Sequence, residues 1–117
     1  MDRVSFTQNI CEVILMMIEE GENPIGDFWK RSDEEQYRLW RIGRDENGNK
    51  IGKTVTDCDG KINISDHQRG RGLDILFLSE DNRQIVEPKR GWNYWHAEWS
   101  RRGGKLAIKG DAGHFGG

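Results

Sequence analysis

The chain has 117 residues, 18 of them basic and 20 acidic, and a formal net charge of −2. A balance this even, with no long block of one sign, excludes the electrostatic footprint of a dedicated nucleic-acid-binding domain. Hydrophobic residues make up only 34% of the chain, yet five tryptophans and four phenylalanines supply enough apolar surface for a folded core. The length fits one domain spanning residues 1–117.

No apolar segment is long enough to cross a membrane. The longest apolar run, residues 13–18, is far shorter than the roughly 20 residues that a spanning helix needs. Glu19 and Glu20 follow it directly, which is not the pattern of a cleaved signal peptide. Cys11 and Cys58 are too few for a disulfide framework or a CxxC zinc site. We therefore expect a cytoplasmic protein without a membrane span.

The first part of the chain predicts two helices. Residues 5–8, Ser-Phe-Thr-Gln, have capping-box order, and apolar residues at helical spacing follow them as far as Gly21. The turn residues of segment 23–26 predict a loop. Residues 32–35, Ser-Asp-Glu-Glu, form a second capping box and open a helix that ends at Gly43.

Turn residues and short β-prone runs, such as residues 53–56, fill the segment from 44 to 63. Within it, residues 45–49 resemble the start of a calcium-binding loop. Gly occupies the fourth position of that loop and no Glu occupies the twelfth, so a polar turn is the better interpretation.

The last part of the chain predicts a strand, a helix and a strand. Residues 73–78 form a short apolar run that favours a strand. Trp92, Trp95 and Trp99 recur at spacings of three and four, which predicts a helix with a buried aromatic stripe. Residues 105–108 alternate and predict a final strand. Helices and strands that do not alternate regularly indicate an α+β fold.

Two of the three histidines lie close in sequence to aspartates. His67 precedes Asp74 by seven residues in a glycine-containing stretch, so a loop running into a strand can bring both to one point. With His114 they make a zinc donor set that leaves a fourth position for water. Asp111, three residues before His114, would suit a general base. Spacing alone, however, favours an ordinary surface or hydrogen-bonded loop residue for each histidine taken separately.

Two motifs carry a resemblance to a known family. Residues 65–74, SDHQRGRGLD, resemble the SxHxxGxAxD signature of the zinc D-alanyl-D-alanine carboxypeptidases and L-alanyl-D-glutamate endopeptidases. Residues 111–115, DAGHF, resemble the second signature of that family, [DE]xxH followed by an aromatic residue. Residues 31–36 and 53–60 are similar to the segments that precede the first signature. The resemblance runs in order from about residue 28 to residue 115.

The resemblance implies a small single-domain zinc peptidase with a short antiparallel sheet flanked by helices, a fold shared with hedgehog-like proteins. It places His67, Asp74 and His114 as the zinc ligands. It makes Asp111 the catalytic carboxylate that accepts a proton from the attacking water. Arg31 becomes the residue that holds a substrate carbonyl or carboxylate.

The same resemblance assigns supporting and substrate-binding positions to Ser65 and Gln36. Three positions depart from the family pattern. Gly72 replaces an alanine, which is a conservative change. Gly113 and Gly116 stand where members often have proline and glutamate, which puts the support of His114 in question.

The implied activity is zinc-dependent hydrolysis of amide bonds in peptidoglycan stem peptides. The implied protein is a phage-type cell-wall lytic enzyme, an endolysin. We expect a monomer whose partner is the stem peptide and which reaches the cell wall only when it is released from the cytoplasm.

Two alternatives stay open. His96, in a Trp-His pair, could replace His114 as the third ligand, but Asn93 stands where the catalytic carboxylate would be, so a helix-face residue is favoured. The protein could also be a non-catalytic module of the same fold that binds zinc or a wall peptide. Asp111 argues against that, because a structural site needs no base beside its ligand.

Overall fold

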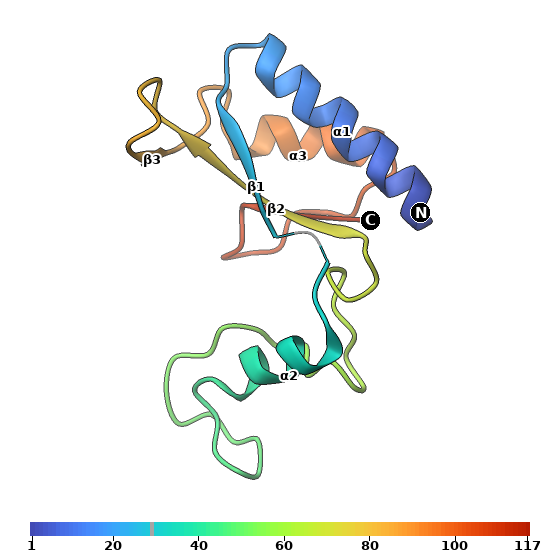
Figure 1. The fold of residues 1–117 in the computed structure, drawn as a ribbon, viewed down its shortest axis with the longest axis vertical. Helices are drawn as coiled ribbons and strands as arrows, with labels where there is room; N and C mark the ends of the chain where they lie inside the picture. Colours follow the sequence, from blue (N-terminus) through green and yellow to red (C-terminus); the bar gives the residue numbers. More distant parts are fainter. Residues whose placement is uncertain (29) are drawn as a thin grey trace.

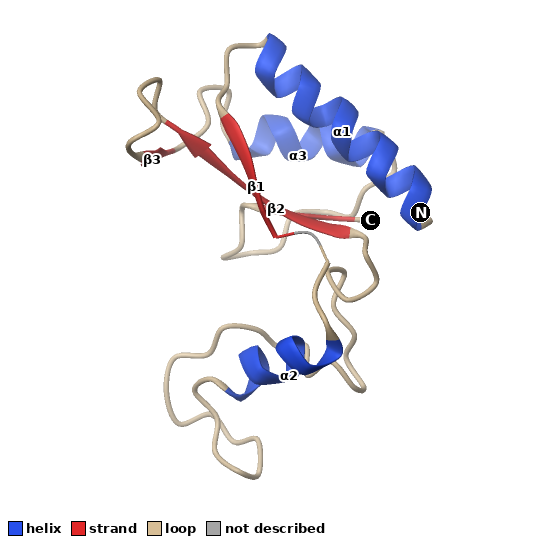
Figure 2. Cartoon of the chain, in the orientation of Figure 1, coloured by secondary structure: helices blue, strands red, loops and turns tan. Residues whose placement is uncertain are grey.

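The computed structural model describes residues 1–28 and 30–117 and contains three helices and a four-stranded antiparallel sheet. In chain order the elements are α1 (Arg3–Glu19), β1 (Pro24–Phe28), α2 (Asp33–Arg41), β2 (Gly72–Leu78), β3 (Ile85–Val86), α3 (Trp92–Arg101) and β4 (His114–Gly116). The fold is therefore the expected small α+β fold with a short antiparallel sheet (Figures 1 and 2). Among the described residues, no helix combines the length and the apolar character needed to cross a membrane.

Strand β2 organises the sheet. It pairs with β1 along most of its length, while β3 and β4 pair with its opposite ends. β3 pairs with Phe77 and Leu78, and β4 pairs with residues 72–74. The short C-terminal strand is therefore held against the beginning of β2, where the first of the two sequence signatures ends.

The hydrophobic core lies between the sheet and helices α1 and α3, which are neighbours in Figure 1. The buried hydrophobic residues of this core come from α1, β2, α3 and β4: Phe6, Ile10, Val13, Met17, Leu73, Ile75, Phe77, Trp95, Trp99 and Phe115. The aromatic stripe of α3 is thus core, as predicted, at Trp95 and Trp99, with Trp92 partly buried. Burial of this set supplies most of the driving force for folding.

The predicted start of the first helix was wrong. Helix α1 begins at Arg3, and its N-cap is Asp2, whose carboxylate accepts a hydrogen bond from the Ser5 backbone N–H at 2.7 Å. Aspartate is as good an N-cap as serine, and the earlier cap adds nearly a turn of helix. The second cap is confirmed, since the Ser32 hydroxyl accepts from the Glu35 N–H at 3.1 Å.

Three further local predictions were wrong. Residues 23–26 do not form a loop, because β1 begins at Pro24. Proline is tolerated at the first residue of a strand. Residues 53–56 are irregular. Residues 105–108 are also not a strand: Leu106 is 81% exposed, and the final strand is His114–Gly116. Pairing with β2, rather than local residue preference, made strands of Pro24–Phe28 and His114–Gly116.

Helix α2 lies at the far end of the molecule from α1 and α3 (Figure 1). The loops around it are fastened by side chains. In the polar turn at 45–49, the Asp45 carboxylate accepts from the backbone N–H groups of Asn47 and Asn49 at 2.9 Å, which confirms the turn interpretation. Because α2 lies far from α1 and α3, the molecule is elongated, with extents of 47 × 33 × 20 Å.

Candidate metal centre

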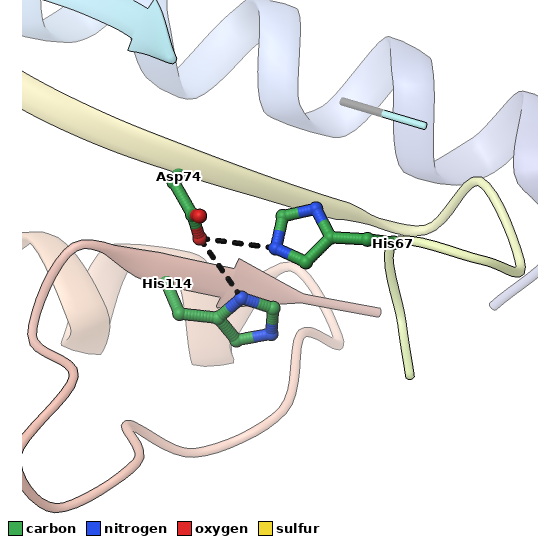
Figure 3. A group of neighbouring side chains, drawn as sticks. All are labelled: His67, Asp74 and His114. Atoms are coloured by element: carbon green, nitrogen blue, oxygen red, sulfur yellow. Dashed lines mark hydrogen bonds and ion pairs between the residues drawn. The ribbon is translucent and has the colours of Figure 1, made fainter. Parts of the chain in front are cut away.

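Three side chains converge beside the start of β2. His67 Nε2 lies 3.1 Å from Asp74 Oδ1, and His114 Nδ1 lies 3.2 Å from the same oxygen. One ligand atom from each residue falls within 4.8 Å of the other two. Figure 3 shows the two rings directed at the carboxylate from different segments. Two imidazole nitrogens and a carboxylate oxygen are suitable donors for a metal ion such as zinc.

The backbone places these donors. Asp74 and His114 are direct partners in the pairing of β2 with β4, so their side chains leave the same face of the sheet side by side. His67 lies in the turn before β2, where its carbonyl accepts hydrogen bonds from the N–H groups of Arg31 and Gly70. The pairing register of a three-residue strand therefore brings together ligands that are 40 residues apart in sequence.

Electrostatics favours the charged forms of Asp74 and His114. Burial alone would raise the pKa of Asp74, but hydrogen bonds from His114 and His67 outweigh it and hold the pKa well below its usual value. Burial would lower the pKa of His114, but contacts with Asp66 and Asp74 raise it to about 9. Without a bound ion, His114 is thus a cation between two carboxylates. A metal ion would take the place of a proton on its ring.

This arrangement predicts that the metal-free protein loses stability in alkali. The pKa of His114 is raised from 6.5 to about 9 by folding, so its stabilising effect is complete below pH 6.5 and is lost as the pH rises through 9. We expect the free energy of unfolding to fall by up to about 3 kcal/mol between pH 6.5 and 9.5. Urea unfolding in the presence of a chelator measures it, with His114→Gln as the control. An equal fall in that variant would contradict the assignment.

The cluster opens into a cavity of about 480 Å³ between the α2 region and the sheet. Asp74 remains accessible there, with 27% of its side chain exposed. Arg31, Ser65 and Asp111 also line this cavity, so the structure brings these predicted site residues to one place. Asp111 is exposed on the turn before β4, and its carbonyl accepts from the His114 N–H at 3.2 Å.

The Arg31 side chain is held by a buried amide. Arg31 Nη1 donates to Gln36 Oε1 at 2.7 Å, and the Ser65 hydroxyl donates to the same oxygen at 3.0 Å. The Gln36 amide nitrogen in turn donates to the Cys58 carbonyl at 2.7 Å. Gln36 itself is fully buried and does not line the cavity. Its position suits support of Arg31 and Ser65 rather than direct contact with a ligand.

His96 lies apart from the three donors. Its Nε2 is 2.6 Å from the Ala112 carbonyl, and its ring stacks on Phe115 with the centroids 4.3 Å apart. It is buried on the face of α3, as the favoured interpretation predicted, and it braces the turn that carries Asp111 and His114.

Sequence reasoning missed Asp66 and Lys105. Asp66 Oδ2 lies 3.1 Å from His114 Nε2, and the Lys105 ammonium forms an ion pair with the other carboxylate oxygen. Burial would raise the pKa of Asp66, but these two partners lower it. Asp66 directly precedes His67, yet no local pattern links it to a histidine 48 residues away.

Comparison of the chain with protein-family models found no match, and comparison with curated proteins found none either. The case for a metal centre therefore rests on the convergence of the three donors.

Proposed function

We propose that this protein is a zinc-dependent peptidase that hydrolyses amide bonds in peptidoglycan stem peptides, in the manner of a phage-type endolysin. One observation carries the proposal: the three residues that two separate signatures single out lie with their ligand atoms within 4.8 Å of one another. Because the cavity beside them is also lined by Asp111 and Arg31, a metal, a base and a cation can face one substrate. Such a set suits hydrolysis better than storage of an ion.

The donors fit zinc, which takes histidine nitrogen and carboxylate oxygen and, at catalytic sites, keeps one position for water or substrate. A zinc ion held by His67, Asp74 and His114 would polarise the scissile carbonyl and make water a stronger nucleophile at neutral pH. Asp111 would take a proton from the attacking water as the new C–O bond forms. It would return that proton to the amine nitrogen as the C–N bond breaks.

Arg31 would act on the substrate. Arg31 lines the cavity, and its Nη1 donates to Gln36 Oε1, so the guanidinium is held in place at the cavity wall. From there it would donate hydrogen bonds to a carbonyl oxygen that gains charge, or to a stem-peptide carboxylate. Lys105 also lines the cavity, but its ammonium forms an ion pair with Asp66.

The test is hydrolysis of purified peptidoglycan by the zinc-loaded protein, followed by mass spectrometry of the released peptides. We expect new amino termini that disappear with chelator and return with zinc. Binding of zinc without release of any peptide would instead identify a non-catalytic zinc- or wall-peptide-binding module. Failure to bind zinc would overturn the proposal as a whole.

Arg31→Lys tests the role of the guanidinium. Lysine keeps the charge but cannot bridge Gln36 and a substrate oxygen with a planar set of donors. We expect kcat/KM for a stem peptide to fall by about 10–100-fold, a loss of about 1.4–2.7 kcal/mol in transition-state stabilisation. Zinc content and thermal stability should not change. Wild-type activity in this variant would remove Arg31 from the proposed mechanism.

A further inference from the structure

The Asp66 carboxylate contacts the nitrogen of His114 that does not face the other two donors. His114 Nδ1 faces Asp74, and Nε2 lies 3.1 Å from Asp66 Oδ2. Both side chains are nearly enclosed, with 8% of His114 and 10% of Asp66 exposed. If Nδ1 is to offer its lone pair to a metal, the ring must carry its proton on Nε2. Asp66 is placed to accept that N–H.

Two glycines make room for this carboxylate. Gly72 and Gly116 are direct partners across β2 and β4. A Cβ at Gly116 would fall 2.2 Å from Asp66 Oδ2 and 3.0 Å from His114 Nε2. A Cβ at Gly72 would fall 3.0 Å from the Asp66 Cβ. The Asp66 side chain therefore occupies space that any other residue at position 116 would fill.

Lys105 also holds the Asp66 carboxylate in this position. The Lys105 ammonium pairs with Asp66 Oδ1, and the Lys105 backbone N–H donates to the Gly116 carbonyl at 2.9 Å. One oxygen of Asp66 is thus bound by Lys105 while the other stays directed at His114. Because both of its oxygens are engaged, the contact of Asp66 with His114 differs from a mobile ion pair on the protein surface.

We propose that Asp66 is a positioning residue for the metal centre. It holds the His114 ring in one orientation and one tautomer, with Nε2 protonated and Nδ1 free to bind the ion. The Gly72–Gly116 pair, which departs from the family pattern, is the space that admits it. A carboxylate behind a metal-binding histidine typically changes metal affinity by about 10–100-fold. The inference rests on the metal-binding part of the proposed function and not on hydrolysis.

The test is a zinc titration against a competing chromophoric chelator at constant pH. We expect Asp66→Ala to weaken zinc binding by about 10–100-fold. Asp81→Ala, which removes one charge in the turn after β2, is the matched control and should bind as tightly as the wild type. Circular dichroism and thermal unfolding of the metal-free variants would verify that each one folds.

Gly116→Ala provides an independent perturbation, since its methyl group would displace Asp66 Oδ2. We expect it to weaken zinc binding too, and the double variant Asp66→Ala/Gly116→Ala to lose less than the sum of the two single losses. In zinc-loaded wild-type protein, ¹⁵N NMR of the imidazole groups should show His114 protonated at Nε2.

The outcomes distinguish a failure of the role proposed for Asp66 from a failure of the proposed function. Zinc binding by the wild type with equal affinity in folded Asp66→Ala would overturn the role of Asp66 and leave the proposed function in place. A wild-type protein that binds no zinc would overturn the proposed function itself. Strictly additive losses in the double variant would show that Gly116→Ala acts elsewhere than on Asp66.

Discussion

Replacing Asp111 by asparagine is expected to leave the metal bound and to lower the hydrolysis of a stem peptide by about 10²–10⁴-fold, the usual contribution of a general base. Asparagine has the shape of aspartate but cannot accept a proton from water at neutral pH. The side chain is exposed at the cavity, and only its backbone carbonyl is bonded to His114, so the exchange should not disturb the donors.

The measurement is kcat with a synthetic stem peptide, together with the zinc content of the same sample. Asp81→Asn makes the same chemical change in the turn after β2 and should retain full activity. Full activity in Asp111→Asn would remove Asp111 from the mechanism. Glu98 is then a weak substitute, because it lies on α3 in an ion pair with Arg101 and does not line the cavity.

Removing either histidine donor should abolish metal binding at micromolar zinc. His67→Ala and His114→Ala each leave two protein donors, one fewer than the three that a catalytic zinc site uses. His114→Ala also leaves Asp66 and Asp74 without the cation that lies between them. We therefore expect this variant to lose stability as well as zinc.

Metal analysis after gel filtration measures the loss, and hydrolysis should fall to background in both variants. His96→Gln is the control that tests the rival ligand, because glutamine can still donate to the Ala112 carbonyl. It should retain one zinc per chain. Loss of zinc in His96→Gln with retention in His114→Ala would transfer the third ligand to His96.

Local signals predicted those parts of the fold that satisfy their own hydrogen bonds or bury one face. The apolar period of α1, the Ser32 cap of α2, the strand within residues 72–78 and the tryptophan stripe of α3 could all be read in this way. His67, Asp74 and His114 were selected as candidate ligands by the resemblance of two signatures to those of a zinc peptidase family, because spacing alone favoured an ordinary loop residue for each histidine. The helix and strand signals, and each signature taken separately, depend on residues that are close together in the sequence.

The sequence by itself thus determined the fold class, the core of α1 and α3, and the chemical identity of the donors. The tertiary structure decided β1, β4 and everything that follows from their pairing. His114–Gly116 is a strand because β2 offers it an edge, and that register sets His114 opposite Asp74 and Gly116 opposite Gly72. The contact of Asp66 with His114 exists only because of this register, since a long-range hydrogen bond leaves no periodic trace in the residues between its partners.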